Sequence, residues 1–368
     1  MVLFLLVFCS LVAARAQSLS INLKQYGFAE IRPKNLRMFF MQSANGQVSF
    51  VGPLVAVSFV HENSKPELTR RDSPGKGMWL FRTAYVDPKN PGATIVRDWW
   101  TASPDNKLIP LSDGRSLIVG GGQLRVYGAT GREEWKLELP SSNVWRSVPY
   151  GEVLVSPTRR TLGLLLDVSR QVESVAIMST ANWEPQTKLF IHRREFDFRD
   201  LILSDDEVAY TTSVAGSTAL CITKFNGTSA TVLKCAACDL HFWFLGADRL
   251  AVEISPGVIV IVRDSEICGA YSLSAWVGDI HVATGGRRLL ALLEKRTAPS
   301  GWLDSFPSVS SVRLSVRDSR TLAEVYGLDL ETKHHRLRGY AINADGSEIA
   351  YLQDDTLHIV SIGNRGEP

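Results

Sequence analysis

The stretch DGSEIAY, residues 345–351, places a short polar turn directly before an apolar run that suits a β-strand. The same pattern of a small polar or glycine turn followed by an apolar run recurs seven times along the chain. The other six instances are GPLVAV (52–57), DGRSLIV (113–119), GEVLV (151–155), DDEVAY (205–210), GADRLAV (246–252) and GGRRLLAL (285–292). The average spacing is about 49 residues, which indicates a chain built from repeated units.

Each unit continues with further strands. The segments LRVYGATGREEWKLEL (124–139), VIVIVRDSEICGAYSLS (258–274) and VRLSVRDSRTLAEVYGLDL (312–330) all have the pattern strand, turn, strand. A unit of about 40–50 residues with four short strands is typical of a β-propeller blade. Because one such sheet cannot cover its own faces, radial packing buries each face against a neighbour. We therefore predict an all-β, seven-bladed β-propeller with four-stranded antiparallel blades.

The last unit supplies only three strands, LRGYAIN, SEIAYLQ and TLHIVSI. The early segment SLSINLK (18–24) has no blade of its own. We predict that this N-terminal strand is the outer strand of the last blade and closes the ring, because an open sheet edge invites aggregation. The alternative is that it is a linker.

The first residues, MVLFLLVFCSLVAARAQS, indicate the compartment. Their apolar run is too short to span a bilayer and ends in Ala14-Arg15-Ala16, a typical cleavage pattern. We predict a signal peptide over 1–16 and a single propeller domain over 17–368, exported to the periplasm or secreted. The alternative is a buried first strand or helix. No transmembrane segment is expected in the mature chain.

The charge pattern excludes one class of partner. The formal net charge is +2, and residues of both signs are spread along the chain without a block of like charges. Nucleic acid is therefore not expected as a partner. The sequence leaves the oligomeric state open.

Four cysteines follow the predicted signal: Cys221, Cys235, Cys238 and Cys268. An even number in an oxidising compartment suggests two disulfides, with three possible pairings. A hairpin turning at Thr228 would set Cys221 opposite Cys235 and leave Cys238 to reach Cys268. The alternatives are free thiols, or redox or metal chemistry at Cys235-Ala-Ala-Cys238, which lacks the expected helix and second ligand pair.

The chain resembles the seven-bladed propellers of exported bacterial proteins, in the broad WD-repeat and quinoprotein-like group. Quinoprotein repeats resemble Ala-x-Asp-x-x-Thr-Gly-x-x-x-Trp. Thr130, Gly131 and Trp135 match this motif, whereas Arg125 and Tyr127 stand at its Ala and Asp positions. The resemblance implies that Trp135 packs between blades. Since the adjacent cysteines of quinone-dependent members are absent, no cofactor is expected.

A second, weaker copy of this motif begins at Asp318. It keeps Thr321 but has Leu322 in place of the Gly and Tyr326 in place of the Trp. This copy too is interpreted as a turn between strands.

Two histidine groups are candidates for ligand contacts. Asp279 and His281 would share one face of a strand, and the inner rim of a propeller is where such a pair meets a ligand. The alternative is an ordinary hydrogen-bonded pair within a blade. His334 and His335 would face opposite sides of a strand, which favours a solvated turn over a metal site. No catalytic, cofactor-binding or metal-ligating residue is predicted.

Aromatic side chains beside loops are candidates for partner contacts, because propellers bind partners on their loop-lined faces and at the channel. The candidates are Trp99, Trp100, Trp183 and Trp302. The leading hypothesis is an exported binding or scaffolding module of the cell envelope, with a protein or envelope component as its partner. The alternative is a lactonase-like or hydrolytic propeller with a metal or acid–base site in the channel. A third possibility, which the resemblance to outer-membrane assembly propellers implies, is a role in assembling envelope proteins.

Overall fold

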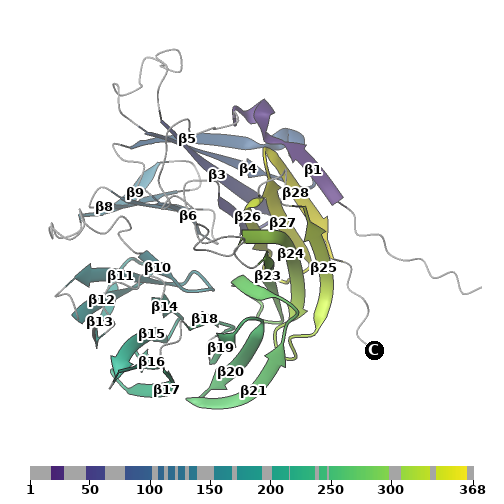
Figure 1. Cartoon of the computed structure of the whole chain (residues 1–368). Coiled ribbons are helices and arrows are strands. Elements are labelled where there is room, and N and C mark those ends of the chain that lie inside the picture. Colours follow the sequence, from purple (N-terminus) through teal and green to yellow (C-terminus); the bar gives the residue numbers. More distant parts are fainter. Residues whose placement is uncertain are drawn as a thin grey trace, which may run out of the picture.

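The structure is a computed structural model that describes most of the chain. The described residues are 18–28, 47–62, 79–101, 107–111, 115–120, 123–128, 132–138, 153–167, 172–192, 201–214, 216–236, 240–246, 248–297, 308–331 and 337–362. They form seven four-stranded antiparallel sheets arranged as blades in a ring (Figure 1). The predicted seven-bladed β-propeller is confirmed. The predicted signal peptide over 1–16 lies outside the described residues.

The blades are numbered along the chain. Blade 1 holds β2 (Gln47–Val51), β3 (Leu54–Glu62), β4 (Trp79–Val86) and β5 (Ile95–Thr101); blade 2 holds β6 (Lys107–Pro110), β7 (Ser116–Gly120), β8 (Gln123–Tyr127) and β9 (Glu133–Glu138); blade 3 holds β10 (Val153–Val155), β11 (Thr161–Asp167), β12 (Val172–Ser179) and β13 (Pro185–His192). A single 3-10 turn, η4 (Pro91–Ala93), lies between β4 and β5.

The remaining blades follow the same order. Blade 4 holds β14 (Leu201–Leu203), β15 (Glu207–Val214), β16 (Ser217–Lys224) and β17 (Ser229–Cys235); blade 5 holds β18 (His241–Phe244), β19 (Arg249–Ser255), β20 (Val258–Arg263) and β21 (Glu266–Ser272); blade 6 holds β22 (Trp276–Val282), β23 (Arg288–Thr297), β24 (Ser308–Asp318) and β25 (Glu324–Leu330); blade 7 holds β26 (Leu337–Ile342), β27 (Glu348–Gln353), β28 (Thr356–Ser361) and β1 (Ser18–Asn22).

The N-terminal strand closes the ring. β1 pairs antiparallel with β28, from Ser18 opposite Val360 to Asn22 opposite Thr356 (Figure 1). A 3-10 turn, η1 (Leu23–Tyr26), follows, and the Asn22 side chain accepts a hydrogen bond from Lys24 N. The prediction that residues 18–24 supply the outer strand of the last blade is therefore confirmed.

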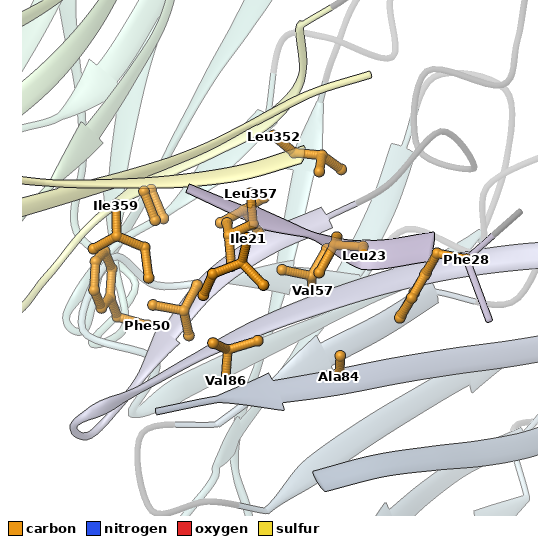
Figure 2. Packing of buried hydrophobic residues seen from close by; sticks show 14 residues of the cluster. Ile21, Leu23, Phe28, Phe50, Val57, Ala84, Val86, Leu352, Leu357 and Ile359 are labelled. Atoms are coloured by element: carbon orange, nitrogen blue, oxygen red, sulfur yellow. The ribbon is translucent and has the colours of Figure 1, made fainter. Parts of the chain in front are cut away.

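The core is divided into seven clusters, one in each gap between neighbouring blades. In β3, Val55 and Val57 face blade 7, whereas Ala56 between them faces blade 2. Because both faces of a blade are covered, the second strands are apolar without alternation. Figure 2 shows the gap between blades 7 and 1, where Leu23 and Phe28 are almost completely buried. Each such side chain stabilises the fold by about 1.5–3 kcal/mol.

The repeat was assigned correctly in six units and wrongly in one. The runs at 52–57, 113–119, 205–210, 246–252, 285–292 and 345–351 all enter the second strand of a blade. GEVLV (151–155) instead ends in β10, the first strand of blade 3, and the equivalent second strand is β11. The turn before β11 has no glycine. Arg159 takes its place with φ 62°, beside 72° for Gly286 and 76° for Gly346.

The three turns are equivalent by their hydrogen bonds. The backbone N–H of Arg159 donates to Ser156 O, as Gly286 donates to Ala283 O and Gly346 to Asn343 O. A large residue in the left-handed region is uncommon, so glycine spacing could not reveal this turn.

The predicted disulfide pairings are wrong. Cys221 and Cys268 are both free thiols, which excludes the Cys221–Cys235 and Cys238–Cys268 pairings. The β16–β17 hairpin pairs Thr223 with Ser229, so Cys221 lies opposite Thr231. A bulge after Cys221 shifts the remaining pairs by one residue, and Cys235 lies opposite Thr218. The physical reason is the position of the turn. The hairpin is centred on Asn226, two positions before Thr228, the centre that would set Cys221 opposite Cys235. Cys238 lies outside the described residues.

Among the described residues, no helix is both long and apolar enough to cross a membrane.

Candidate functional site

The first strands of the seven blades line the centre of the ring and surround a cavity of about 580 Å³. Every one of these inner strands contributes lining residues, and most of the side chains are apolar, from Val48 on β2 to Ile342 on β26. The volume falls within the range of about 300–1,000 Å³ that is typical of ligand pockets. This channel pocket is the candidate site.

One wall of the pocket carries a polar cluster. The Asp279 Oδ2 atom lies 3.0 Å from Nε2 of His281 and accepts a hydrogen bond of 3.0 Å from the Tyr340 hydroxyl. Asp279 and His281 are two residues apart on β22, and Tyr340 comes from the neighbouring inner strand β26. The His281 and Tyr340 rings lie 4.8 Å apart at 31°. The cluster therefore joins blades 6 and 7.

The charge of this cluster follows from its contacts. Burial alone would raise the pKa of Asp279, but the charge and hydrogen bond of His281, the Tyr340 hydroxyl and Ile280 N–H together hold that pKa below its ordinary value. Burial and the neighbouring Asp279 raise the pKa of Tyr340 well above its ordinary value. At neutral pH the site thus presents an ionised carboxylate and a neutral phenol.

This carboxylate is accessible. The side chains of Asp279 and His281 are 40% and 38% exposed, so both meet solvent within the pocket. The prediction that Asp279 and His281 share a strand face on the inner rim agrees with this geometry. Tyr340 was missed, because the contact spans 61 residues and nothing in the sequence pairs these two positions.

Arg159 lies on the opposite side of the pocket. Its Nη1 donates to Phe50 O at 3.2 Å, and its Nη2 hydrogen-bonds Ser49 Oγ. Burial lowers the pKa of this guanidinium. The side chain reaches from the β10–β11 turn of blade 3 to the inner strand of blade 1, so it braces two blades that are not neighbours in the ring.

Trp243 supplies the aromatic part of the lining. It is half-buried on β18, beside the inner strand that carries Asp279. Its ring meets His241 edge-on, with centroids 6.3 Å apart. Three consecutive inner strands, β18, β22 and β26, thus place an indole, a carboxylate and a phenol on one side of the pocket.

Of the aromatic residues expected to contact partners, three lie in described strands or turns, and none of these three lines the pocket. Trp99 and Trp100 are on β5, the outermost strand of blade 1, opposite Phe81 and Leu80. Trp183 is buried, with 7% of its surface exposed, so it is not available to a partner. Trp302 lies outside the described residues.

Trp135 and Trp183 belong to the hydrophobic cluster between blades 2 and 3. Trp135 on β9 stacks on Trp183 with ring centroids 5.2 Å apart. The Arg115 guanidinium lies 5.4 Å from the Trp183 ring, and its Nη2 donates to Thr180 O at 2.9 Å. Trp135 therefore occupies a position between blades, although Thr130 and Gly131 of its motif lie outside the described residues.

No metal site is found among the described residues, which contain no group of three or more His, Cys, Asp or Glu side chains able to hold an ion. His334 and His335 fall in a part of the chain that is not described.

Comparisons with known proteins bear on the fold. No family model matches the chain, and no curated protein matches it. A chain in the crystal structure of the mitotic checkpoint complex is similar, with a TM-score of 0.51, 9% sequence identity and coverage of 86% of this chain and 87% of that one. The C-terminal WD40 domain of Sif2 gives a TM-score of 0.49 and 10% identity, over 85% of this chain and 93% of that domain. The likeness to the mitotic checkpoint complex chain bears on the fold alone, which is a seven-bladed β-propeller.

Proposed function

We propose that this protein is an exported, non-catalytic propeller that binds a protein partner at its central channel and acts as a scaffold in the cell envelope. The observation that carries the proposal is the channel pocket, an apolar cavity of about 580 Å³ with one polar cluster on its wall. An apolar centre with a few directed polar groups is the arrangement of an interface hot spot.

The rigidity of the lining supports this function. The pocket is formed mainly by strands, and each of the seven inner strands among the described residues pairs with the second strand of its own blade. A preformed site binds without the entropic loss of ordering its own backbone. Trp243 is the aromatic residue best placed to act as an anchor for a partner.

The site is tested by capturing proteins from an envelope fraction on immobilised protein and on two variants. Trp243→Ala removes the aromatic wall of the pocket. Ile267→Ser is the matched control, because Ile267 is 53% exposed on the outer strand β21 of the same blade. We expect one partner to be retained by the wild type and the control and lost from Trp243→Ala, and to bind again when purified. Equal retention by all three proteins would rule out the channel as the binding site.

Export rests on the apolar segment that ends at Ala16. Expression of the full coding sequence in a host with an envelope tests it. We expect fractionation to place the protein outside the cytoplasm and N-terminal sequencing to begin at Gln17. A full-length protein that stays in the cytoplasm would contradict export.

The Asp279–His281 pair supports a second candidate, a hydrolytic propeller with an acid–base site in the channel. A carboxylate that contacts an imidazole orients that ring for proton transfer. Assay of lactone and ester hydrolysis by the wild type and His281→Gln tests this function. Turnover that His281→Gln abolishes while folding is retained would favour the enzyme, and equal rates in both would exclude it for those substrates.

A further inference from the structure

The channel pocket combines features that select the charge of its occupant. Asp279 is the only carboxylate among the described residues that line it. Its side chain is 40% exposed, so it is open to a ligand as well as to His281 and Tyr340. An ionised group in an apolar surround is stabilised by a partner of opposite charge.

Arg159, which carries the guanidinium of the pocket, is engaged at the other wall. Both terminal nitrogens of Arg159 make hydrogen bonds to blade 1, to Ser49 Oγ and Phe50 O. Asp279 lies on blade 6, between Trp243 of blade 5 and Tyr340 of blade 7. The side of the pocket around Asp279 therefore carries a carboxylate beside an imidazole, together with aromatic surface.

We propose that this side of the pocket binds the ammonium or guanidinium group of a lysine or arginine side chain supplied by the protein partner. Asp279 is the counter-ion, and the Trp243 ring provides a cation–π surface. The apolar stem of the basic side chain packs against Ile280 and Val282, which also line the pocket. This inference rests on the proposed function and names the chemistry of the partner.

Direct titration with small probes tests the inference without the natural partner. N-acetyl-arginine methylamide and N-acetyl-lysine methylamide are the cationic probes, and N-acetyl-citrulline methylamide is a neutral probe of nearly the same shape as arginine. Calorimetry is the measurement. We expect saturable one-to-one binding of at least one cationic probe, and binding of citrulline that is weaker by roughly ten-fold or more. Citrulline binding as tight as that of the tighter cationic probe, or no binding of either cation, would overturn the proposal.

Three variants connect the binding to the pocket. Asp279→Asn keeps the shape but removes the charge, and we expect it to weaken the cationic probe by roughly ten-fold while citrulline is unaffected. Asp329→Asn is the matched control, since Asp329 is a 76% exposed carboxylate on the outer strand of the same blade. Tyr340→Phe keeps the ring and removes one donor to Asp279, which provides a second variant if Asp279→Asn unfolds. Unchanged binding in folded Asp279→Asn would contradict the assignment.

The outcome also separates this inference from the proposed function. A partner captured through Trp243, together with no preference for cationic probes, would leave the scaffold function standing and reject the basic side chain. Cationic probes that bind when no protein partner is captured would identify a site for small amines, and would reject the partner as the source of the cation.

Discussion

Trp183 and Leu322 occupy the same position in two blades that are far apart in the sequence. Both have positive φ, 61° and 55°, and both are buried in the gap to the preceding blade. Trp183 N donates to Ser179 O, and Leu322 N donates to Asp318 O, four residues earlier in each case. Arg115 donates to Thr180 O of one turn, and Arg249 donates to Ser319 O of the other. In both turns, a position with positive φ, which favours glycine, carries a large side chain that fills the gap to the preceding blade.

The equivalence of these two turns predicts how Trp183 can be replaced. Trp183→Leu introduces the residue type that Leu322 has in the equivalent turn of blade 6. This variant should destabilise the protein less than Trp183→Ala. For Trp183→Ala we expect a loss of about 3–5 kcal/mol, because the cavity faces Trp135. Urea denaturation measures both. An alanine variant as stable as the leucine variant would show that the indole does not fill the gap.

Arg159 combines backbone strain with a bracing contact. Both Arg159→Ala and Arg159→Gly lose the hydrogen bonds to blade 1, but only glycine relieves the φ of 62°. Arg159→Gly should therefore be more stable than Arg159→Ala by about 1 kcal/mol. The free energies of unfolding of the two variants decide this. A more stable alanine variant would contradict the strained turn.

Ring closure depends on the buried side chains that follow β1. Leu23 is fully buried between blades 7 and 1, so Leu23→Ala should cost about 2–5 kcal/mol. Ser18→Ala, at the exposed start of the same strand, should change stability by less than about 0.5 kcal/mol. Thermal unfolding measures the stability of both variants, and light scattering detects aggregation of a ring that is not closed. A silent Leu23→Ala would show that the N-terminal segment does not contribute to closure.

The lowered pKa of Asp279 gives stability a pH dependence of known sign. The folded-state pKa lies below the ordinary value of about 3.9. The stabilisation of the folded protein by ionised Asp279 is therefore complete above that value and is lost as the pH falls through the folded-state pKa. Asp279→Asn lacks this contribution at every pH. We expect the stability difference between the wild type and Asp279→Asn to shrink below about pH 4. A difference that does not change between pH 7 and pH 3 would contradict it.

The cysteines should differ in their reaction with iodoacetamide. Cys268 is exposed and should be alkylated in the folded protein, whereas Cys221 is buried and should react only after unfolding. Cys235 and Cys238 are the remaining candidates for a disulfide, and mass mapping without reduction should find them linked to each other. Recovery of either one linked to Cys221 or Cys268 would contradict the structure.

The sequence was sufficient to predict the fold wherever the blades repeat the same local pattern of turn and strand. The second strand of every blade is apolar throughout because both faces of the blade are covered, and a short turn precedes it. The number of blades and the role of residues 18–24 could therefore be predicted from the sequence pattern alone. The pattern did not predict the turn before β11, where a contact with another blade allows a different residue to take the position of the glycine. Arg159 replaces a glycine because blade 1 holds its side chain, and no local signal records that contact.

The candidate site was predicted only in part for the same reason. Asp279 and His281 are neighbours on one strand, so the period of two reveals their shared face. Tyr340 joins them only when the ring brings β26 beside β22. The position of Cys221 shows a further limit, since a turn centred two residues earlier than expected moves every pair of the hairpin out of the predicted register.

The pairing of β1 with β28 also constrains how the chain folds. Ser20 and His358 hydrogen-bond across 338 positions of sequence, so the first strand to be synthesised has no partner in the ring until the last strand exists. Contacts of such separation form slowly, because the whole intervening chain must be closed into a loop. The ring therefore stays open throughout synthesis. Until residues 356–360 have been synthesised, residues 18–22 therefore lack the strand with which they pair.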